Sequence, residues 1–324
     1  MCRRILAWLL PTVMGCTPMS LSAQSLLQHV DQMLTANYRK VNSDTAYVTR
    51  PTTDWTVTAR LNVSGATIET EGLDMGQRFR SQMEANSKAT LSLGVSYHGI
   101  TLSLGLNPAK MMGKYQDYEL NFNCYRRNFG FDVIYQDAKN FTGWYDQEGL
   151  GRISLPDGML KVQTLNLNAY YAFNNRRFSY PAAFSQSYIQ RRSAGSFLLA
   201  ASYMAQRATL DWEQGMKLKM NNVGIGAGYG YNYVPARGWL LHISALPTLI
   251  VYSPASMTFG EVRTKLHYQF PEAIITGRGA VVRNWSNKFL GLSMVYNYTN
   301  IGDRDDFSVY NTKWRIRTFF GVRL

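Results

Sequence analysis

The sequence predicts an all-β fold, a transmembrane antiparallel up-and-down β-barrel of about twelve strands with a short N-terminal periplasmic helix. From Trp55 to the last residue, apolar and polar residues alternate with a period of two. Long and short connections alternate between these segments, as external loops and periplasmic turns do in such barrels. After the N-terminal stretch no apolar run is long enough for a membrane-spanning helix, so a membrane protein of this kind must close its backbone hydrogen bonds in a barrel.

Residues 1–23 have the features of a secretory signal peptide. Arg3 and Arg4 form a positive start, residues 5–15 are largely apolar, and Leu21-Ser22-Ala23 offers a small-residue cleavage site. Lipidation of Cys16 is the alternative, although Met14 fits that pattern poorly. After cleavage Cys124 is the remaining thiol, which excludes an internal disulfide, and we interpret it as apolar filler.

Residues 24–53 are predicted to form a periplasmic segment ahead of the barrel, which spans 54–324. Within residues 24–40 apolar side chains recur at helical spacing and predict a short amphipathic helix. The strands are expected near residues 57–65, 91–97, 101–107, 118–124, 129–135, 164–174, 197–203, 223–233, 239–251, 273–285, 290–298 and 313–324. Pro247 suggests a bulge in the ninth of them.

The connections give a second test of the barrel. Those at 98–99, 126–128, 234–238 and 286–287 are short, whereas 66–88, 108–115, 138–161, 206–221, 252–272 and 300–312 are longer. This alternation predicts that both termini lie in the periplasm. Residues 174–193 break the rule, because a tight turn is expected there; either they fold into the lumen as a partial plug or the strand count is wrong.

A soluble β-sandwich is the alternative explanation of alternation. Tyrosine and tryptophan near the strand ends favour the membrane barrel, since they form an aromatic girdle. The net charge of +13, which falls to +11 without Arg3 and Arg4, does not indicate nucleic acid binding, because an exported chain seldom meets it and no basic run is present. Anionic lipid head groups or an anionic solute are better candidates.

An enzyme built on such a barrel would need a hydroxyl nucleophile with a histidine close to it as the base. His29 falls in the predicted helix, His98 in a tight turn and His267 in an external loop. Only His242 falls within a strand, two residues from Ser244 and on the same face, so the two form a candidate dyad beside the simpler reading that both line the lumen.

No P-loop, dinucleotide fingerprint or Cys/His cluster occurs, so neither a cofactor nor a metal is expected. Asp303, Asp305 and Asp306 with Asn300 form an acidic loop, but Arg304 and the spacing favour a solvated loop over a calcium site.

Basic residues fall on the predicted lumen face of the first and last strands, which become neighbours when the barrel closes. These candidate lumen-lining residues are Arg60, Arg315, Arg317 and Arg323. They could bias the interior toward anions, or pair with Glu119 and Asp132 in a narrow barrel, which we favour.

Several short segments resemble an uncharacterised exported family, domain of unknown function 4421. They are Asp44-Thr45-Ala46-Tyr47-Val48, Arg50-Pro51, Asn168-Ala169-Tyr170-Tyr171 with Phe173-Asn174, residues 182–186 and residues 193–197. The resemblance covers residue 30 to the end and implies an outer-membrane barrel with no established activity, so it assigns no catalytic residue. The last strand ends in Leu324, whereas the usual insertion signal ends in Phe or Trp.

Three functions follow as hypotheses. The first is a structural or binding barrel with a narrow or closed lumen in the outer membrane of a Gram-negative bacterium, the second a channel for small anionic solutes, and the third a membrane-embedded lipid-modifying enzyme. The expected partners are outer-membrane lipids and, during insertion, the barrel assembly machinery.

Overall fold

The computed structural model describes residues 43–324 apart from positions 75, 99, 107–117, 127, 140, 212–214, 267–271 and 304–306. Before residue 43 it describes Gln28 and Gln32, both in helical conformation. The predicted signal peptide and the rest of the predicted helix lie outside the described residues. So do His29, His267 and the centre of the acidic loop.

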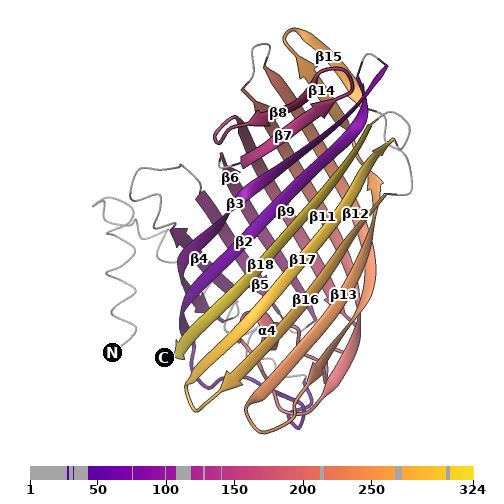
Figure 1. The fold of residues 1–324 in the computed structure, drawn as a ribbon. Coiled ribbons are helices and arrows are strands. Elements are labelled where there is room, and N and C mark those ends of the chain that lie inside the picture. The colour runs from indigo at the N-terminus through magenta and orange to yellow at the C-terminus, as the bar shows by residue number, and fades with distance from the viewer. Residues whose placement is uncertain are drawn as a thin grey trace. The chain divides into compact units, whose positions relative to one another are not determined.

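Twelve strands form a closed antiparallel barrel, which confirms the predicted all-β barrel and its number of strands (Figure 1). Each strand pairs with its neighbours in the chain, and the last strand pairs with the first along its whole length. The strands are β2 (Trp55–Asp74), β3 (Gln77–Tyr97), β4 (Ile100–Leu106), β5 (Tyr118–Tyr125), β6 (Phe129–Ala138), β9 (Leu160–Ala172), β11 (Ala194–Leu210), β12 (Met216–Tyr233), β13 (Trp239–Tyr252), β16 (Glu272–Asn284), β17 (Lys288–Asp303) and β18 (Phe307–Arg323).

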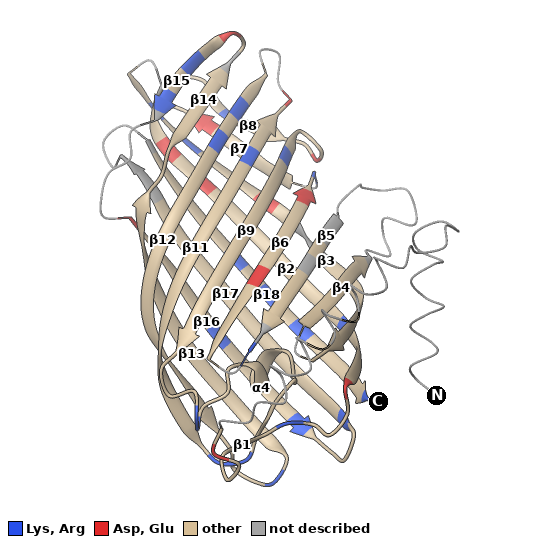
Figure 2. Cartoon of the chain, turned by 180° about the vertical axis from the view of Figure 1, so that it is seen from behind, with Lys and Arg blue, Asp and Glu red and all other residues tan. Residues whose placement is uncertain are grey.

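The wall has an apolar outside and a largely polar inside. In β2 the side chains of Thr58, Arg60 and Asn62 are buried, whereas those of Val57 and Leu61, on the other face, are exposed. Large apolar side chains on other strands face outward in the same way. Figure 2 shows that charged residues gather toward the two ends of the barrel and are sparse along the middle of the wall. This is the surface that a hydrocarbon layer requires.

Several connections that the sequence predicts as loops are strands. The predicted loop 66–88 is mostly the outer part of the hairpin between β2 and β3. Two further hairpins lie in the predicted loops 138–161 and 252–272, formed by β7 (Phe141–Gln147) with β8 (Gly151–Leu155) and by β14 (Ala255–Phe259) with β15 (Val262–Leu266). Pairing continues here because it satisfies backbone groups outside the apolar band. We call this the long-hairpin end.

The opposite end, which we call the short-turn end, carries the first and last residues of the wall. Trp55 and Leu324 exchange backbone hydrogen bonds of 2.9 and 3.2 Å. His98, in the turn between β3 and β4, has a positive φ of 48°, and its Nε2 lies 2.9 Å from Oδ1 of Asp54. The expected bulge at Pro247 is absent from the pairing with β16, which runs through it in register; the register shifts instead between Val223 and Gly224.

Residues 174–193, which we call the plug, fold into the short-turn end of the barrel (Figure 1). They contain the helix α4 (Pro181–Phe184) and the strand β10 (Ile189–Gln190), which pairs with β1 (Val48–Thr49). Among the described residues, no helix combines the length and apolar character needed to cross a bilayer. The overlong turn is thus a packed insertion, and the strand count stands.

Candidate functional site

The plug packs its aromatic side chains against the inner wall. Phe178 and Tyr188 are fully buried, and Tyr180 nearly so. The ring of Phe178 covers Gly230 of β12, where a Cβ atom would lie 3.1 Å from Cζ of the ring. The Tyr180 ring lies 4.5 Å from that of Tyr170 of β9. A larger residue at position 230 would occupy the space that the ring fills, so this glycine makes room for the plug.

Asn232, at the short-turn end of β12, anchors the plug with hydrogen bonds. Its Nδ2 donates to the backbone oxygen of Ser179 over 2.8 Å and to Oε1 of Gln190 over 2.9 Å. Gln190 Oε1 also accepts from the backbone N–H of Ser179. Asn232 is completely buried, so these bonds have no competition from water.

Arg323 anchors the other side of the plug. Its Nη2 donates to the backbone oxygen of Gln186 over 3.3 Å and to Oδ1 of Asn284 over 2.7 Å. Its guanidinium carbon lies 4.8 Å from the centre of the Phe289 ring. A buried arginine at the end of the last strand therefore has a structural contact in the plug and does not line the cavity above it.

The segment before the barrel braces the plug from the short-turn end. Asp44 and Tyr47 make backbone hydrogen bonds with Arg176 and Arg191, at 2.9 and 2.7 Å. Arg50 donates to the hydroxyl of Tyr188 over 3.3 Å. The strands β1 and β10 add two residue pairs. The plug is therefore held by contacts with the barrel wall and with the segment that precedes β2.

His242 and Ser244, the candidate dyad, are hydrogen-bonded beneath the plug. Nε2 of His242 lies 3.0 Å from Oγ of Ser244, and Nδ1 lies 2.7 Å from Oδ1 of Asn232. Because Asn232 donates through Nδ2, its Oδ1 must accept from Nδ1–H, which leaves Nε2 to accept the Ser244 hydroxyl proton. This is the order of groups in a serine nucleophile, a histidine base and an orienting amide.

The same groups form a chain of hydrogen bonds that ends in the plug. It runs from Ser244 through His242 and Asn232 to the Ser179 carbonyl oxygen. His242 and Ser244 are each only 4% exposed. In this arrangement the pair satisfies buried polar groups and fixes the plug, and the plug covers the serine hydroxyl.

Tyr180 is a neutral phenol in this setting. Burial raises the pKa of its hydroxyl above the ordinary value, whereas the nearby Arg278 charge acts in the opposite direction. The hydroxyl therefore remains protonated and able to donate.

Above the plug, the lumen contains a cavity of about 340 Å³. Tyr180, Phe184 and Ser185 of the plug form its floor. At the other side it is bounded by apolar residues such as Phe141 and Val162, which belong to a buried cluster under the outer hairpins. The cavity thus lies between two packed regions of the barrel interior.

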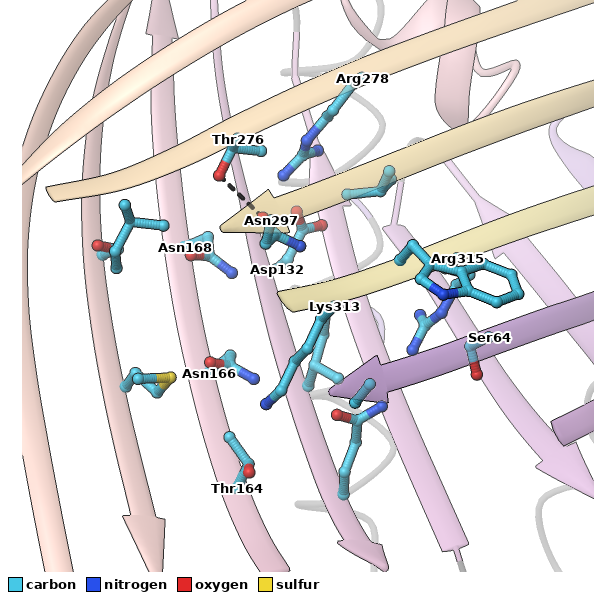
Figure 3. Close-up of a pocket in the computed structure, with 18 of the residues that line it drawn as sticks. Ser64, Asp132, Thr164, Asn166, Asn168, Thr276, Arg278, Asn297, Lys313 and Arg315 are labelled. Atoms are coloured by element: carbon cyan, nitrogen blue, oxygen red, sulfur yellow. Dashed lines mark hydrogen bonds between the residues drawn. The ribbon is translucent and has the colours of Figure 1, made fainter. Parts of the chain in front are cut away.

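Basic residues outnumber acidic ones along the cavity. Figure 3 shows Arg278 of β16 and Lys313 and Arg315 of β18 projecting into it. Arg60 and Arg317 also line it, and Arg317 donates to Oδ1 of Asn62 over 2.7 Å. The acidic lining residues are Asp132 and Asp137.

Amides and hydroxyls line the opposite wall. Thr164, Asn166 and Asn168 follow one another along the inner face of β9 (Figure 3). On β17, Asn297 accepts a hydrogen bond of 2.8 Å from the Thr276 hydroxyl through Oδ1, so its Nδ2 is the group that remains to donate. The cavity therefore combines cations with groups that both donate and accept hydrogen bonds.

The structure separates the four arginines singled out in the sequence. Arg60, Arg315 and Arg317 line the cavity, whereas Arg323 anchors the plug. Asp132, their expected partner, lines the same cavity, and the side chain of Glu119 lies outside those described. Sequence reasoning did not single out Asn232, Arg278 or Lys313. Lys313 shares the alternation of Arg315 and could have been included, but nothing local distinguishes Asn232.

A protein-family model described as "Domain of unknown function (DUF4421)" matches residues 42–324. No functionally curated protein matches the chain. The solved structures that it resembles include three bacterial proteins with low sequence identity.

Outer membrane protease OmpT from Escherichia coli is 9% identical, with a TM-score of 0.42 and 85% of this chain and 97% of that chain covered. The translocator domain of the autotransporter NalP from Neisseria meningitidis is 8% identical, with a TM-score of 0.29 and coverage of 94% and 98%. The outer membrane protein OprG from Pseudomonas aeruginosa is 10% identical, with a TM-score of 0.29 and coverage of 85% and 97%.

Proposed function

The chain belongs to the DUF4421 family, and from that premise we propose that it is an outer-membrane binding barrel whose lumen is closed by its own plug. The proposal rests on the plug. Its aromatic residues are buried against the wall, and it is fixed by Asn232 and Arg323 from different strands. A segment with so many contacts across the lumen obstructs passage of solutes through the short-turn end.

The outer membrane is the location that the surface supports. Outward-facing Leu93, Phe197 and Ile243 are 63–70% exposed, which is costly in water and favourable in lipid. Trp239 and Trp285 lie near the short-turn end with the Arg283 guanidinium within 6 Å of both rings, as interfacial aromatics do. We assign the short-turn end, with both ends of the barrel wall, to the periplasm, because periplasmic turns are the short ones.

Conductance in planar bilayers tests the closed lumen. The purified full chain is compared with a variant in which residues 178–190 are replaced by a glycine-serine linker of equal length. Both proteins keep the same barrel wall, so they insert into the bilayer in the same way. The wild-type barrel is expected to give no resolved steps, and the linker variant to give steps. Stable open steps from the wild type would contradict the proposal.

A channel for small anionic solutes is the second candidate, favoured by the excess of basic residues along the cavity. The same recording separates the two functions. Anion-selective steps from the wild-type barrel that are lost in the Arg315→Ala/Arg317→Ala variant would favour the channel.

We do not favour the lipid-modifying enzyme. The His242–Ser244 hydrogen bond supplies the first requirement of a nucleophile, but the plug covers both residues. If His242→Ala changed the lipid composition of the membrane while the plug stayed in place, this assignment would be wrong.

A further inference from the structure

We propose that the cavity above the plug binds a hydroxylated organic anion of about monosaccharide size, such as a sugar acid. The inference rests on the proposed closed binding barrel and names its ligand class. The anionic group would lie on Arg278, Lys313 and Arg315, and the hydroxyls on the amide wall formed by Asn166 and Asn168.

The strand register places the three cations together. Arg278 pairs with Val295, which in turn pairs with Arg315, so the backbones of the two arginines are about 10 Å apart across β17. Lys313 is two residues from Arg315 on the same face, about 7 Å along β18. Long side chains from these positions reach a common point in the lumen, which is what a carboxylate or phosphate needs.

The acidic residues of the cavity do not match this group of cations. Asp137 already has a partner in Lys161, with a distance of 3.2 Å from Oδ2 to Nζ, and accepts a hydrogen bond from Gln163. Within the described part of the chain, Lys313 makes no ion pair with a carboxylate. Among the described lining residues five are basic and two, Asp132 and Asp137, are acidic, so a local positive surplus remains for a ligand.

The amide wall distinguishes a hydroxylated anion from an inorganic one. In the described residues the side-chain amides of Asn166 and Asn168 have no hydrogen-bond partner. Each offers an oxygen that accepts as well as a nitrogen that donates. The oxygens of a bare phosphate or sulfate accept hydrogen bonds from protein donors and leave the amide oxygens without a partner. A sugar hydroxyl, in contrast, donates to an amide oxygen and accepts from an amide nitrogen. A ligand that spans both walls therefore needs hydroxyl groups in addition to its charge.

The size and the floor of the cavity agree with this ligand class. A volume of about 340 Å³ is at the small end of the roughly 300–1,000 Å³ typical of small-molecule sites. The floor presents the ring of Phe184, which is only partly buried and whose centre lies 5.8 Å from the guanidinium carbon of Arg278. Such a ring packs against the C–H groups of a sugar, and the arginine beside it fixes the charged end.

Isothermal titration calorimetry of the purified full chain in detergent tests the inference, because it measures binding without a reporter group. Glucuronate is the probe, and neutral glucose and inorganic phosphate are the matched probes that lack the charge or the hydroxyls. We expect saturable binding of glucuronate, and binding of glucose and phosphate weaker by about tenfold or more. Lys313→Met and Asn168→Leu should each weaken glucuronate binding by about tenfold.

Lys217→Met is the control variant, because Lys217 is exposed on the outer part of β12; it should bind glucuronate as the wild type does. Absence of glucuronate binding, equal binding of phosphate, or binding unchanged by both lumen substitutions would overturn the inference. Conductance of the same preparations separates the two proposals. A silent barrel that fails to bind glucuronate contradicts the ligand alone, whereas an open wild-type barrel contradicts the proposed function.

Discussion

Replacing Asn232 by alanine is expected to release the plug while the barrel wall stays intact. The substitution removes three buried hydrogen bonds, with Ser179, Gln190 and His242. The Ser179 carbonyl oxygen and Nδ1–H of His242 lose their partner, whereas Gln190 Oε1 still accepts from the Ser179 backbone. Each orphaned buried group costs about 1–3 kcal/mol, so plug docking weakens by roughly 2–6 kcal/mol. This corresponds to a roughly 30-fold to 20,000-fold larger open population.

Hydrogen exchange followed by mass spectrometry measures this directly. Peptides covering residues 178–190 should lose protection in Asn232→Ala, while peptides from β2 and β18 keep theirs. Asn222→Ala is the matched control, because Asn222 lies on the same strand and the same face, is equally buried, and contacts Ser253 rather than the plug. Unchanged protection of the plug in Asn232→Ala, or an equal loss in the control, would refute the reasoning.

Two further perturbations act on the plug by other means. Gly230→Val places a branched side chain where the Phe178 ring lies, and overpacking of this kind costs about 1–3 kcal/mol; the plug should lose exchange protection, whereas Gly277→Val, with no atom within 4 Å of its Cβ, should not. The raised pKa of Tyr180 means that the docked plug binds this proton more tightly than the open one. The protonated hydroxyl therefore contributes fully to the free energy of plug docking below the ordinary tyrosine pKa of about 10. This contribution is lost as the pH rises through the raised pKa of the docked state. Conductance should therefore appear at alkaline pH in the wild type, and an identical alkaline threshold in Tyr180→Phe would contradict the assignment.

The barrel wall was predictable because one physical signal recurs along it. The alternation of Val57 and Leu61 with Thr58 and Arg60 indicates which face of the wall points outward. Beyond the apolar band both faces are polar, so period two no longer marks inside and outside, and the outer part of the hairpin between β2 and β3 was predicted as a loop. The length of residues 174–193 signalled an insertion, but its contacts depend on closure of the barrel.

The candidate site was predictable only where neighbours in space are also neighbours in sequence. His242 and Ser244 are two residues apart on one face, and this local relation is seen in the structure. Asn232 meets His242 through the pairing of β12 with β13, which the sequence does not specify at this precision. Arg278 lies on the strand with the weakest alternation, so its place beside Arg315 emerges only from the register of β16, β17 and β18.

Thiol accessibility of the cavity tests the closed lumen most directly. In a background in which Cys2, Cys16 and Cys124 are replaced by serine, Asn166→Cys places one thiol in the cavity above the plug. A small membrane-impermeant maleimide is confined to the side of the bilayer that faces the short-turn end. A thiol that stays unlabelled in the intact barrel, and becomes labelled when Asn232→Ala is added, is the predicted result. Labelling of the intact barrel as fast as that of a cysteine on its surface would contradict a lumen closed by the plug.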